Sequence, residues 1–244
     1  NIKSFPSENN FKNYEDKFIN PGDTSKYWIA EQEKINNSKK IIFLKTHMAV
    51  CKVNGNSFTN NKNTLGAIYV IRDPRNVITS LSNHYQISID EAYDFMKDEK
   101  RAIFSKVDNR YLGFQFLMSW SLNHKSWIEN KNFPVLLVKY EDLVKETFHV
   151  FKNVIQFINK LTNNQNKFNK DRAIKVIENT SFEKLQSLEK KYGFSEAMLK
   201  KGTKDRIKFF NLGKANKYQI LLSEDLINKM NKKYENELKK FNYE

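Results

Sequence analysis

One apolar segment, Ala67–Ile71, ends on a charged turn and continues directly into a stretch with helical character. Because the segment lacks polar alternation, it predicts a parallel strand that is buried on both faces. Asp73 then fits the N-cap of the following helix, and Pro74 fits its first position, where the missing N–H has no intrahelical partner. A buried parallel strand that leads into a helix is typical of an α/β fold.

The turn after this strand has the features of an anion-binding corner. Arg72 follows the strand directly, and Ser80 lies eight positions further on, about two helical turns away. In open α/β sheets, ligands gather at the carboxyl ends of strands, where helix N-termini offer N–H groups to anions. The charged fork of Arg72 suits a phosphate, and the hydroxyl of Ser80 can add a donor. The alternative is an ordinary ion pair between Arg72 and Asp73, with Ser80 an ordinary helix residue.

A second apolar run, residues 41–44, ends in Lys45-Thr46-His47. Because alternate residues of an extended chain point to the same side, we expect Lys45 and His47 to project together from the end of a second buried strand. A lysine can neutralise charge on a leaving group, and a histidine, with an ordinary pKa of about 6.5, can take a proton from a hydroxyl. An ordinary surface turn is the alternative.

The order of these segments resembles the sulfotransferase family, whose members move a sulfuryl group from 3′-phosphoadenosine-5′-phosphosulfate to an acceptor. That family has Lys-Thr-His at one strand end and, after another strand, an Arg and a Ser at the spacing of Arg72 and Ser80. Its further motifs occur here in the same order: Tyr140-Glu141-Asp142-Leu143, Thr180-Ser181-Phe182, and residues 209–214. The resemblance implies a three-layer, P-loop-like α/β fold, with a central parallel sheet flanked by helices, in a single domain over residues 1–244.

The resemblance also implies a role for each matched residue. His47 is expected to be the general base that deprotonates a hydroxyl or amine acceptor, and Lys45 to stabilise charge on the phosphate as the sulfate leaves. Arg72 and Ser80 are expected to hold the 3′-phosphate of the cofactor. The other matched residues surround the nucleotide: Tyr140 and Thr180 line the adenosine pocket, Phe182 stacks near the base, and Gly213 and Lys214 close a loop over the 3′-phosphate. No metal ion is expected, because sulfuryl transfer needs mainly in-line positioning and charge stabilisation.

The chain departs from the family pattern at two places. The family's loop has Arg-Lys-Gly, whereas this chain has Asn211, Leu212 and Gly213. Because Asn211 brings no charge, the 3′-phosphate clamp is expected to depend on Arg72 and Lys214, with Arg206 as a further candidate. The family also has a phosphosulfate loop of the form Pro-Lys-Ser-Gly-x-Thr-Trp, and nothing of this form precedes the run at residues 41–44. We therefore expect a first strand and its loop to be missing from this sequence.

The composition indicates partners and compartment. The net charge is +14 from 42 basic residues, but these are spread along the chain, so a polyanionic cofactor or an acidic acceptor is expected rather than nucleic acid. The acceptor is expected to be a small molecule or a carbohydrate. No apolar stretch approaches the ~20 residues that cross a membrane. Cys51, the one cysteine, excludes an internal disulfide and fits a reducing compartment, so a cytoplasmic location is expected.

Two other functions remain open. A P-loop-type small-molecule kinase shares the architecture and the phosphate corner, but it requires a Gly-x-x-x-x-Gly-Lys-Ser/Thr loop and an acidic magnesium site, which this sequence lacks. A non-catalytic nucleotide-binding module would explain Arg72 and Ser80 without a need for Lys45 and His47.

Hydrophobic periodicity predicts the remaining elements. Helices are expected over residues 25–36, 89–104, 113–129, 143–161 and 224–241, and a loop over residues 51–63. The stripe formed by Leu117, Trp120, His124 and Trp127 is expected to belong to the core rather than to an acceptor pocket.

Overall fold

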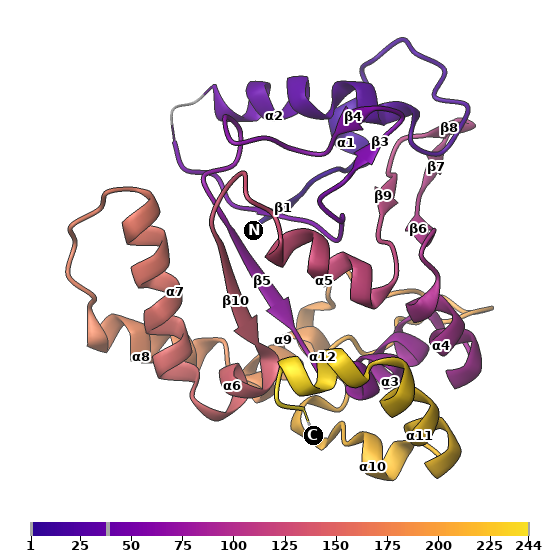
Figure 1. Ribbon diagram of the computed structural model, residues 1–244, viewed down its shortest axis with the longest axis vertical. Coiled ribbons are helices and arrows are strands. Elements are labelled where there is room, and N and C mark those ends of the chain that lie inside the picture. Colours follow the sequence, from indigo (N-terminus) through magenta and orange to yellow (C-terminus); the bar gives the residue numbers. More distant parts are fainter. Residues whose placement is uncertain (1, 38–39, 244) are drawn as a thin grey trace. The chain divides into compact units, whose positions relative to one another are not determined.

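The computed structural model describes residues 2–37 and 40–243, and Figure 1 shows the order of its helices and strands. The chain divides into two compact units, each assembled from two stretches of sequence. Unit 1 comprises Asn1–Tyr69 and Lys97–Leu136, and unit 2 comprises Val70–Met96 and Leu137–Glu244.

Unit 1 is built from short strands and a few helices. Its elements are β1 (Lys3–Ser4), α1 (Glu8–Phe11), the 3₁₀ helix η1 (Asp23–Tyr27), α2 (Trp28–Asn36), β2 (Leu44–Lys45), β3 (Lys52–Val53), β4 (Asn56–Ser57), β6 (Ala102–Ile103), β7 (Lys106–Val107), β8 (Arg110–Tyr111), β9 (Gln115–Phe116) and α5 (Trp120–Ile128). Strands β1 and β2 pair in parallel, and the N–H of Phe5 continues the ladder by donating to the carbonyl of Lys45 at 2.8 Å. The pairs β3–β4, β6–β9 and β7–β8 are antiparallel.

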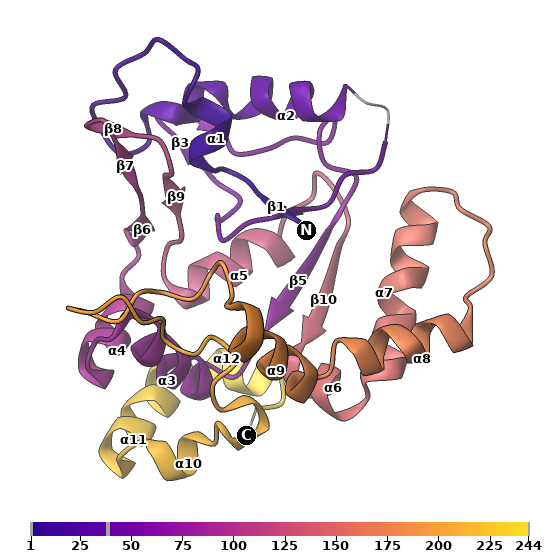
Figure 2. The same ribbon diagram turned by 180° about the vertical axis from the view of Figure 1, so that it is seen from behind.

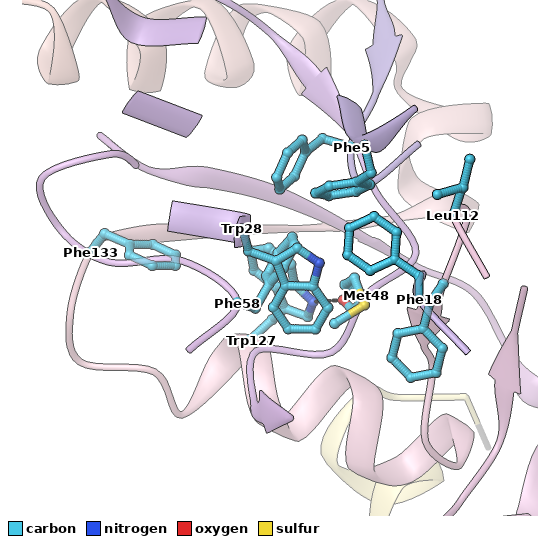
Figure 3. Close-up of a cluster of buried hydrophobic side chains, with 10 residues drawn as sticks. Phe5, Phe18, Trp28, Met48, Phe58, Leu112, Trp127 and Phe133 are labelled. Atoms are coloured by element: carbon cyan, nitrogen blue, oxygen red, sulfur yellow. Dashed lines mark hydrogen bonds between the residues drawn. The ribbon is translucent and has the colours of Figure 1, made fainter. Parts of the chain in front are cut away.

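Buried aromatic and aliphatic side chains form the core of unit 1 (Figure 3). Trp28 and Met48 are fully buried, and the rings of Trp28 and Phe58 meet edge to face with centroids 5.7 Å apart. The indole N–H of Trp127 donates to the carbonyl of Met48 at 2.8 Å, the dashed line of Figure 3. Burial of each such side chain contributes about 1.5–3 kcal/mol. The cluster therefore fixes the segment that follows His47 against helix α5.

Two strands run from unit 1 into unit 2. β5 (Ala67–Ile71) has the predicted bounds and neighbours β10 (Val135–Lys139) in a two-stranded sheet. The two strands run in the same direction in both views (Figure 1, Figure 2). The predicted burial on both faces is wrong, because Ile68 and Val70 are 37% and 55% exposed whereas Ile71 is 2% exposed. Side chains of a strand alternate between its faces, and the face of Ile68 and Val70 is the less covered one.

Unit 2 is mostly helical. Its helices are α3 (Pro74–Tyr85), α4 (Ile89–Lys97), α6 (Tyr140–Lys145), α7 (Thr147–Leu161), α8 (Lys170–Asn179), α9 (Phe182–Tyr192), η2 (Gly213–Ala215), α10 (Tyr218–Leu221), α11 (Glu224–Lys233) and α12 (Glu235–Lys240). Along the chain, helices thus lie between strands that pair in parallel, β1 with β2 and β5 with β10, and this arrangement is typical of the α/β class. None of the helices in the described ranges is long and apolar enough to span a membrane.

Several predicted helices are shorter or divided. The helix expected over residues 113–129 begins only at Trp120, because Phe114 is drawn into the core and residues 115–116 pair with β6. The helix expected over residues 89–104 ends at Lys97, because residues 102–103 form β6, the strand that pairs with residues 115–116. Helix 25–36 starts with the 3₁₀ turn η1. The predicted helix 143–161 is interrupted at Glu146, whose ψ of 45° is not helical, and helix 224–241 is interrupted at Tyr234.

The segment over residues 51–63 is not a plain loop, because it contains the β3–β4 hairpin. Asn54 and Gly55 occupy its turn with φ of 51° and 80°, and Asn-Gly is the pair that tolerates such angles best. Two members of the predicted stripe are buried, His124 at 0% and Trp127 at 7% exposed, whereas Trp120 is only half-buried.

Candidate functional site

The corner between β5 and α3 is organised by a buried ion pair. Asp73 is the N-cap of α3, as predicted, and its side chain accepts the N–H of Arg75 at 2.9 Å. The same carboxylate pairs with the Arg75 guanidinium at 2.8 Å, and the two side chains are 7% and 5% exposed. Arg75 also donates to the side chain of Asn231 and to the carbonyl of Tyr243. The C-terminal residues are thereby attached to the start of α3.

Arg72 takes a different set of partners. Its guanidinium lies over the ring of Tyr140, 4.3 Å from the centroid, and donates to the hydroxyl of Ser80 at 3.4 Å. The alternative in which Arg72 merely pairs with Asp73 is therefore wrong for this described corner, where Asp73 is paired with Arg75. The structure brings Arg72, Ser80 and Tyr140 together, and this set presents a cation and a hydroxyl, the groups that bind phosphate.

Gly213 and Phe182 are also brought together. A Cβ atom at Gly213 would lie 2.7–2.9 Å from three ring carbons of Phe182, and Gly213 has a φ of +53°. Both the close approach and the left-handed backbone require glycine. The ring of Phe182 therefore packs under the segment expected to cover the 3′-phosphate, in addition to the base-stacking role that the resemblance implies.

Helix α9 holds this segment by further contacts that the sequence analysis missed. Gln186 donates to the carbonyl of Phe210 at 2.8 Å, and the carboxylate of Glu189 accepts the N–H groups of Phe209 at 2.6 Å and Phe210 at 2.9 Å. With Phe182, these residues have the spacing i, i+4, i+7 of one helix face. This spacing in the sequence indicates a helix face that packs against another part of the protein. It does not indicate that the face contacts the backbone of Phe209 and Phe210.

Thr180 and Lys214 lie at the edges of this arrangement. Thr180 is the C-cap residue of α8 and is exposed, and its hydroxyl donates to the carbonyl of Val176 at 2.8 Å. Ser181 is the N-cap of α9, so Thr180 and Phe182 flank the joint between two helices. Lys214 lies on η2 and is exposed. Neither position conflicts with a role beside a nucleotide, and both roles stay predictions.

Lys45 and His47 belong to unit 1. The predicted buried strand over residues 41–44 is mostly wrong, since β2 is Leu44–Lys45 alone and residues 41–43 are 40–54% exposed. The strand ends there because β1, its parallel partner, is itself only two residues long. Lys45 is still at the end of a strand, and His47 follows two residues later, outside any strand, with an exposed side chain.

The backbone at His47 is held from both sides. Its N–H donates to the side chain of Gln115 at 3.0 Å, and its carbonyl accepts the amide of Asn123 at 3.2 Å. Asn123 also accepts the hydroxyl of Tyr69 at 2.8 Å. Burial raises the pKa of Tyr69, so this phenol stays protonated and remains a donor. These two main-chain hydrogen bonds fix the position of the His47 backbone.

A groove of about 550 Å³ lies in unit 1 along α5, and one of its lining residues, Val50, follows His47 by three positions. Val50, Met118, Leu122, Lys125, Ser126, Glu129, Asn130, Lys131 and Asn132 line it. Its volume falls within the usual range for small-molecule sites, and its lining combines a few apolar side chains with several polar ones.

Comparison with known proteins identifies the family. The sequence model of the sulfotransferase domain matches residues 8–242. The chain belongs to the sulfotransferase family. Luciferin sulfotransferase of Photinus pyralis is 23% identical over 188 residues, which cover 76% of this chain and 47% of that protein. The chain thus spans about half the length of this curated relative.

A solved sulfotransferase has the same fold. The crystal structure of the mouse sulfotransferase SULT7A1 complexed with PAP matches with a TM-score of 0.55 at 16% identity, over 84% of this chain and 70% of that one. At such low identity the likeness concerns the fold alone. The predicted P-loop-like α/β fold is thereby confirmed, whereas the roles of individual residues stay predictions.

Proposed function

We propose that this protein transfers a sulfuryl group from 3′-phosphoadenosine-5′-phosphosulfate to a hydroxyl or amine acceptor. Membership of the sulfotransferase family supports the reaction class. The observation that carries the proposal is the position of Arg72, which precedes α3, lies over the ring of Tyr140 and donates to the hydroxyl of Ser80 within that helix. A stacked guanidinium beside a hydroxyl is a preorganised site for a dianionic phosphate.

The side chains at this corner fit the cofactor. Arg72 and Ser80 would hold the 3′-phosphate, with Gly213 and Lys214 above it and Tyr140, Thr180 and Phe182 around the adenosine. When bound, the cofactor supplies the activated sulfuryl group. The close packing of Gly213 on Phe182 lets the backbone of the covering segment approach without a side chain in between.

The transfer step is assigned to the two residues at the end of β2. His47 would accept the proton of the acceptor hydroxyl, a role for which an exposed imidazole is suited. Lys45 would offset the negative charge that grows on the departing phosphate. The hydrogen bonds to Gln115 and Asn123 hold the backbone of His47, so that its position does not depend on the acceptor.

The groove along α5 is the proposed acceptor site. It begins at Val50, three residues after His47, and includes Leu122, Lys125 and Ser126. A small hydroxyl compound or a sugar fits its volume and its mixed lining. Leu122→Trp would fill the groove, so it should raise the KM for the acceptor while the affinity for adenosine 3′,5′-bisphosphate stays constant.

Calorimetric titration of Arg72→Ala tests the cofactor assignment. The variant should lose about 10-fold to 100-fold in affinity for adenosine 3′,5′-bisphosphate, the worth of a hydrogen bond to a charged group, and much less for adenosine 5′-monophosphate. Arg172→Ala removes the same charge from the exposed surface of α8 and should change neither affinity. Equal losses for both nucleotides in Arg72→Ala would refute the assignment.

A transfer assay separates the proposed reaction from the alternatives. Turnover with the phosphosulfate donor in the absence of magnesium supports sulfuryl transfer. ATP-dependent turnover would instead indicate a kinase, and tight nucleotide binding without any turnover would indicate a non-catalytic module.

A further inference from the structure

Asn216 lies at the centre of a hydrogen-bond network between α3 and the segment after η2. Its side chain is 6% exposed, although it comes from a surface segment rich in lysine. Its amide nitrogen donates to the carbonyl of Asn76 at 3.0 Å and to the hydroxyl of Ser80 at 2.9 Å. Its amide oxygen accepts the hydroxyl of Thr79 at 2.6 Å. Every hydrogen-bonding atom of this buried amide therefore has a partner on α3.

The network determines which way the amide of Asn216 points. A backbone carbonyl can only accept, so the atom 3.0 Å from the carbonyl of Asn76 has to be the nitrogen. The second proton of that nitrogen then faces Ser80. The N–H of Tyr218 donates to the side chain of Asn76 at 2.9 Å and attaches the same segment to α3 a second time.

This orientation decides what Ser80 can do. A serine hydroxyl has two acceptor positions and one proton. Both acceptor positions face donors, the amide of Asn216 at 2.9 Å and the guanidinium of Arg72 at 3.4 Å. Among the residues that the structure describes, the proton faces only the carbonyl of Asn76 at 3.4 Å, a distance longer than the roughly 2.5–3.0 Å of a good O–H···O bond. Ser80 is exposed, so this proton is available to an anion.

We propose that Asn216 is a positioning residue that makes the Ser80 hydroxyl a dedicated donor and thereby gives this protein its preference for nucleotides with a 3′-phosphate. The inference rests on the proposed binding of that phosphate at Arg72 and Ser80. It also accounts for the neutral Asn211 in the covering segment, because part of the selectivity comes from an oriented hydroxyl rather than from a further charge.

The test is a double-mutant cycle with Asn216→Ala, Ser80→Ala and the combined variant. Each is titrated calorimetrically with adenosine 3′,5′-bisphosphate and with adenosine 5′-monophosphate. Each single variant should lose about 10-fold in affinity for the bisphosphate, which is the lower end of the contribution that a hydrogen bond to a charged group makes to binding. The affinity for the monophosphate should change little. The combined variant should lose no more than Ser80→Ala alone, because coupled residues are not additive. Asn159→Ala, which removes a hydrogen bond to the carbonyl of Asn166, is the matched control and should change neither affinity.

The outcomes separate the two proposals. If the unaltered protein shows no preference for the bisphosphate, the proposed function itself fails. If Ser80→Ala removes the preference and Asn216→Ala keeps it, or if their losses add, the role of Asn216 is refuted. Equal loss for both nucleotides in Asn216→Ala would show a merely structural role. Should that variant not fold, Thr79→Val, which removes the donor to the amide oxygen, must lower the preference at least threefold, and an unchanged preference would refute the proposal.

Discussion

Replacement of Arg75 should destabilise this protein more than any surface substitution. Its guanidinium is 5% exposed, pairs with a carboxylate that is 7% exposed, and also binds Asn231 and the carbonyl of Tyr243. Arg75→Met keeps the apolar stem but leaves Asp73 as a buried charge without its partner. Breaking a buried pair in this way costs about 3–5 kcal/mol. For a chain of this size, that lowers Tm by about 6–20 °C.

The choice of probe follows from the position of the tryptophans. Trp28, Trp120 and Trp127 all belong to unit 1, whereas Arg75 belongs to unit 2. Far-UV circular dichroism in urea is therefore the primary measurement, because it reports the helices of unit 2, and tryptophan fluorescence shows whether unit 1 unfolds in the same transition.

Two further variants make the stability prediction refutable. Glu235→Gln disrupts the exposed pair with Lys239, whose side chains are 61% and 59% exposed, and should cost less than about 1 kcal/mol. Asp73→Asn combined with Arg75→Met removes both charges of this buried pair and keeps a good N-cap, so it should recover at least half of the loss. A cost for Arg75→Met no larger than that of Glu235→Gln would refute the reasoning.

Three other predictions concern the proposed base His47, the thiol of Cys51 and the segment held by α9. His47→Ala should lower turnover by about 10²–10⁴-fold in the transfer assay while calorimetry shows unchanged affinity for adenosine 3′,5′-bisphosphate, and retained turnover would exclude His47 as the base. Burial raises the pKa of Cys51 to about 11, so its alkylation by iodoacetamide should be slow at pH 8 and should speed up about tenfold for each pH unit toward 11; a rate like that of free cysteine would contradict this. Glu189→Ala should accelerate amide hydrogen exchange at Phe209 and Phe210 by roughly tenfold or more, and unchanged exchange would show that the carboxylate does not hold these N–H groups.

Some of the predictions from the sequence are untested by the structure. The single-domain organisation, the cytoplasmic location, the exclusion of nucleic acid and the roles of the individual site residues stay predictions. The division into two compact units describes how the chain packs locally.

The corner at β5 and α3 was predictable because its signals are local. An apolar run predicts the strand, the N-cap Asp73 and the proline after it predict the start of the helix, and Arg72 with Ser80 follows from a helical spacing. Each signal acts over fewer than ten residues, a range over which backbone propensities and side-chain spacing are decisive. The family and its fold followed from the order of several such local motifs.

Only the tertiary structure decided which distant residues complete that corner. Asn216 is 136 residues from Ser80, and Tyr243 is 168 residues from Arg75. The tertiary structure also decided that residues 102–103 and 115–116 form strands, because the two segments are strands only through their pairing with one another. Neither a hydrogen-bond partner nor a strand pairing is a property of a local sequence window. The sequence alone thus determined where an anion could bind, and the fold decided which side chains orient the groups that bind it.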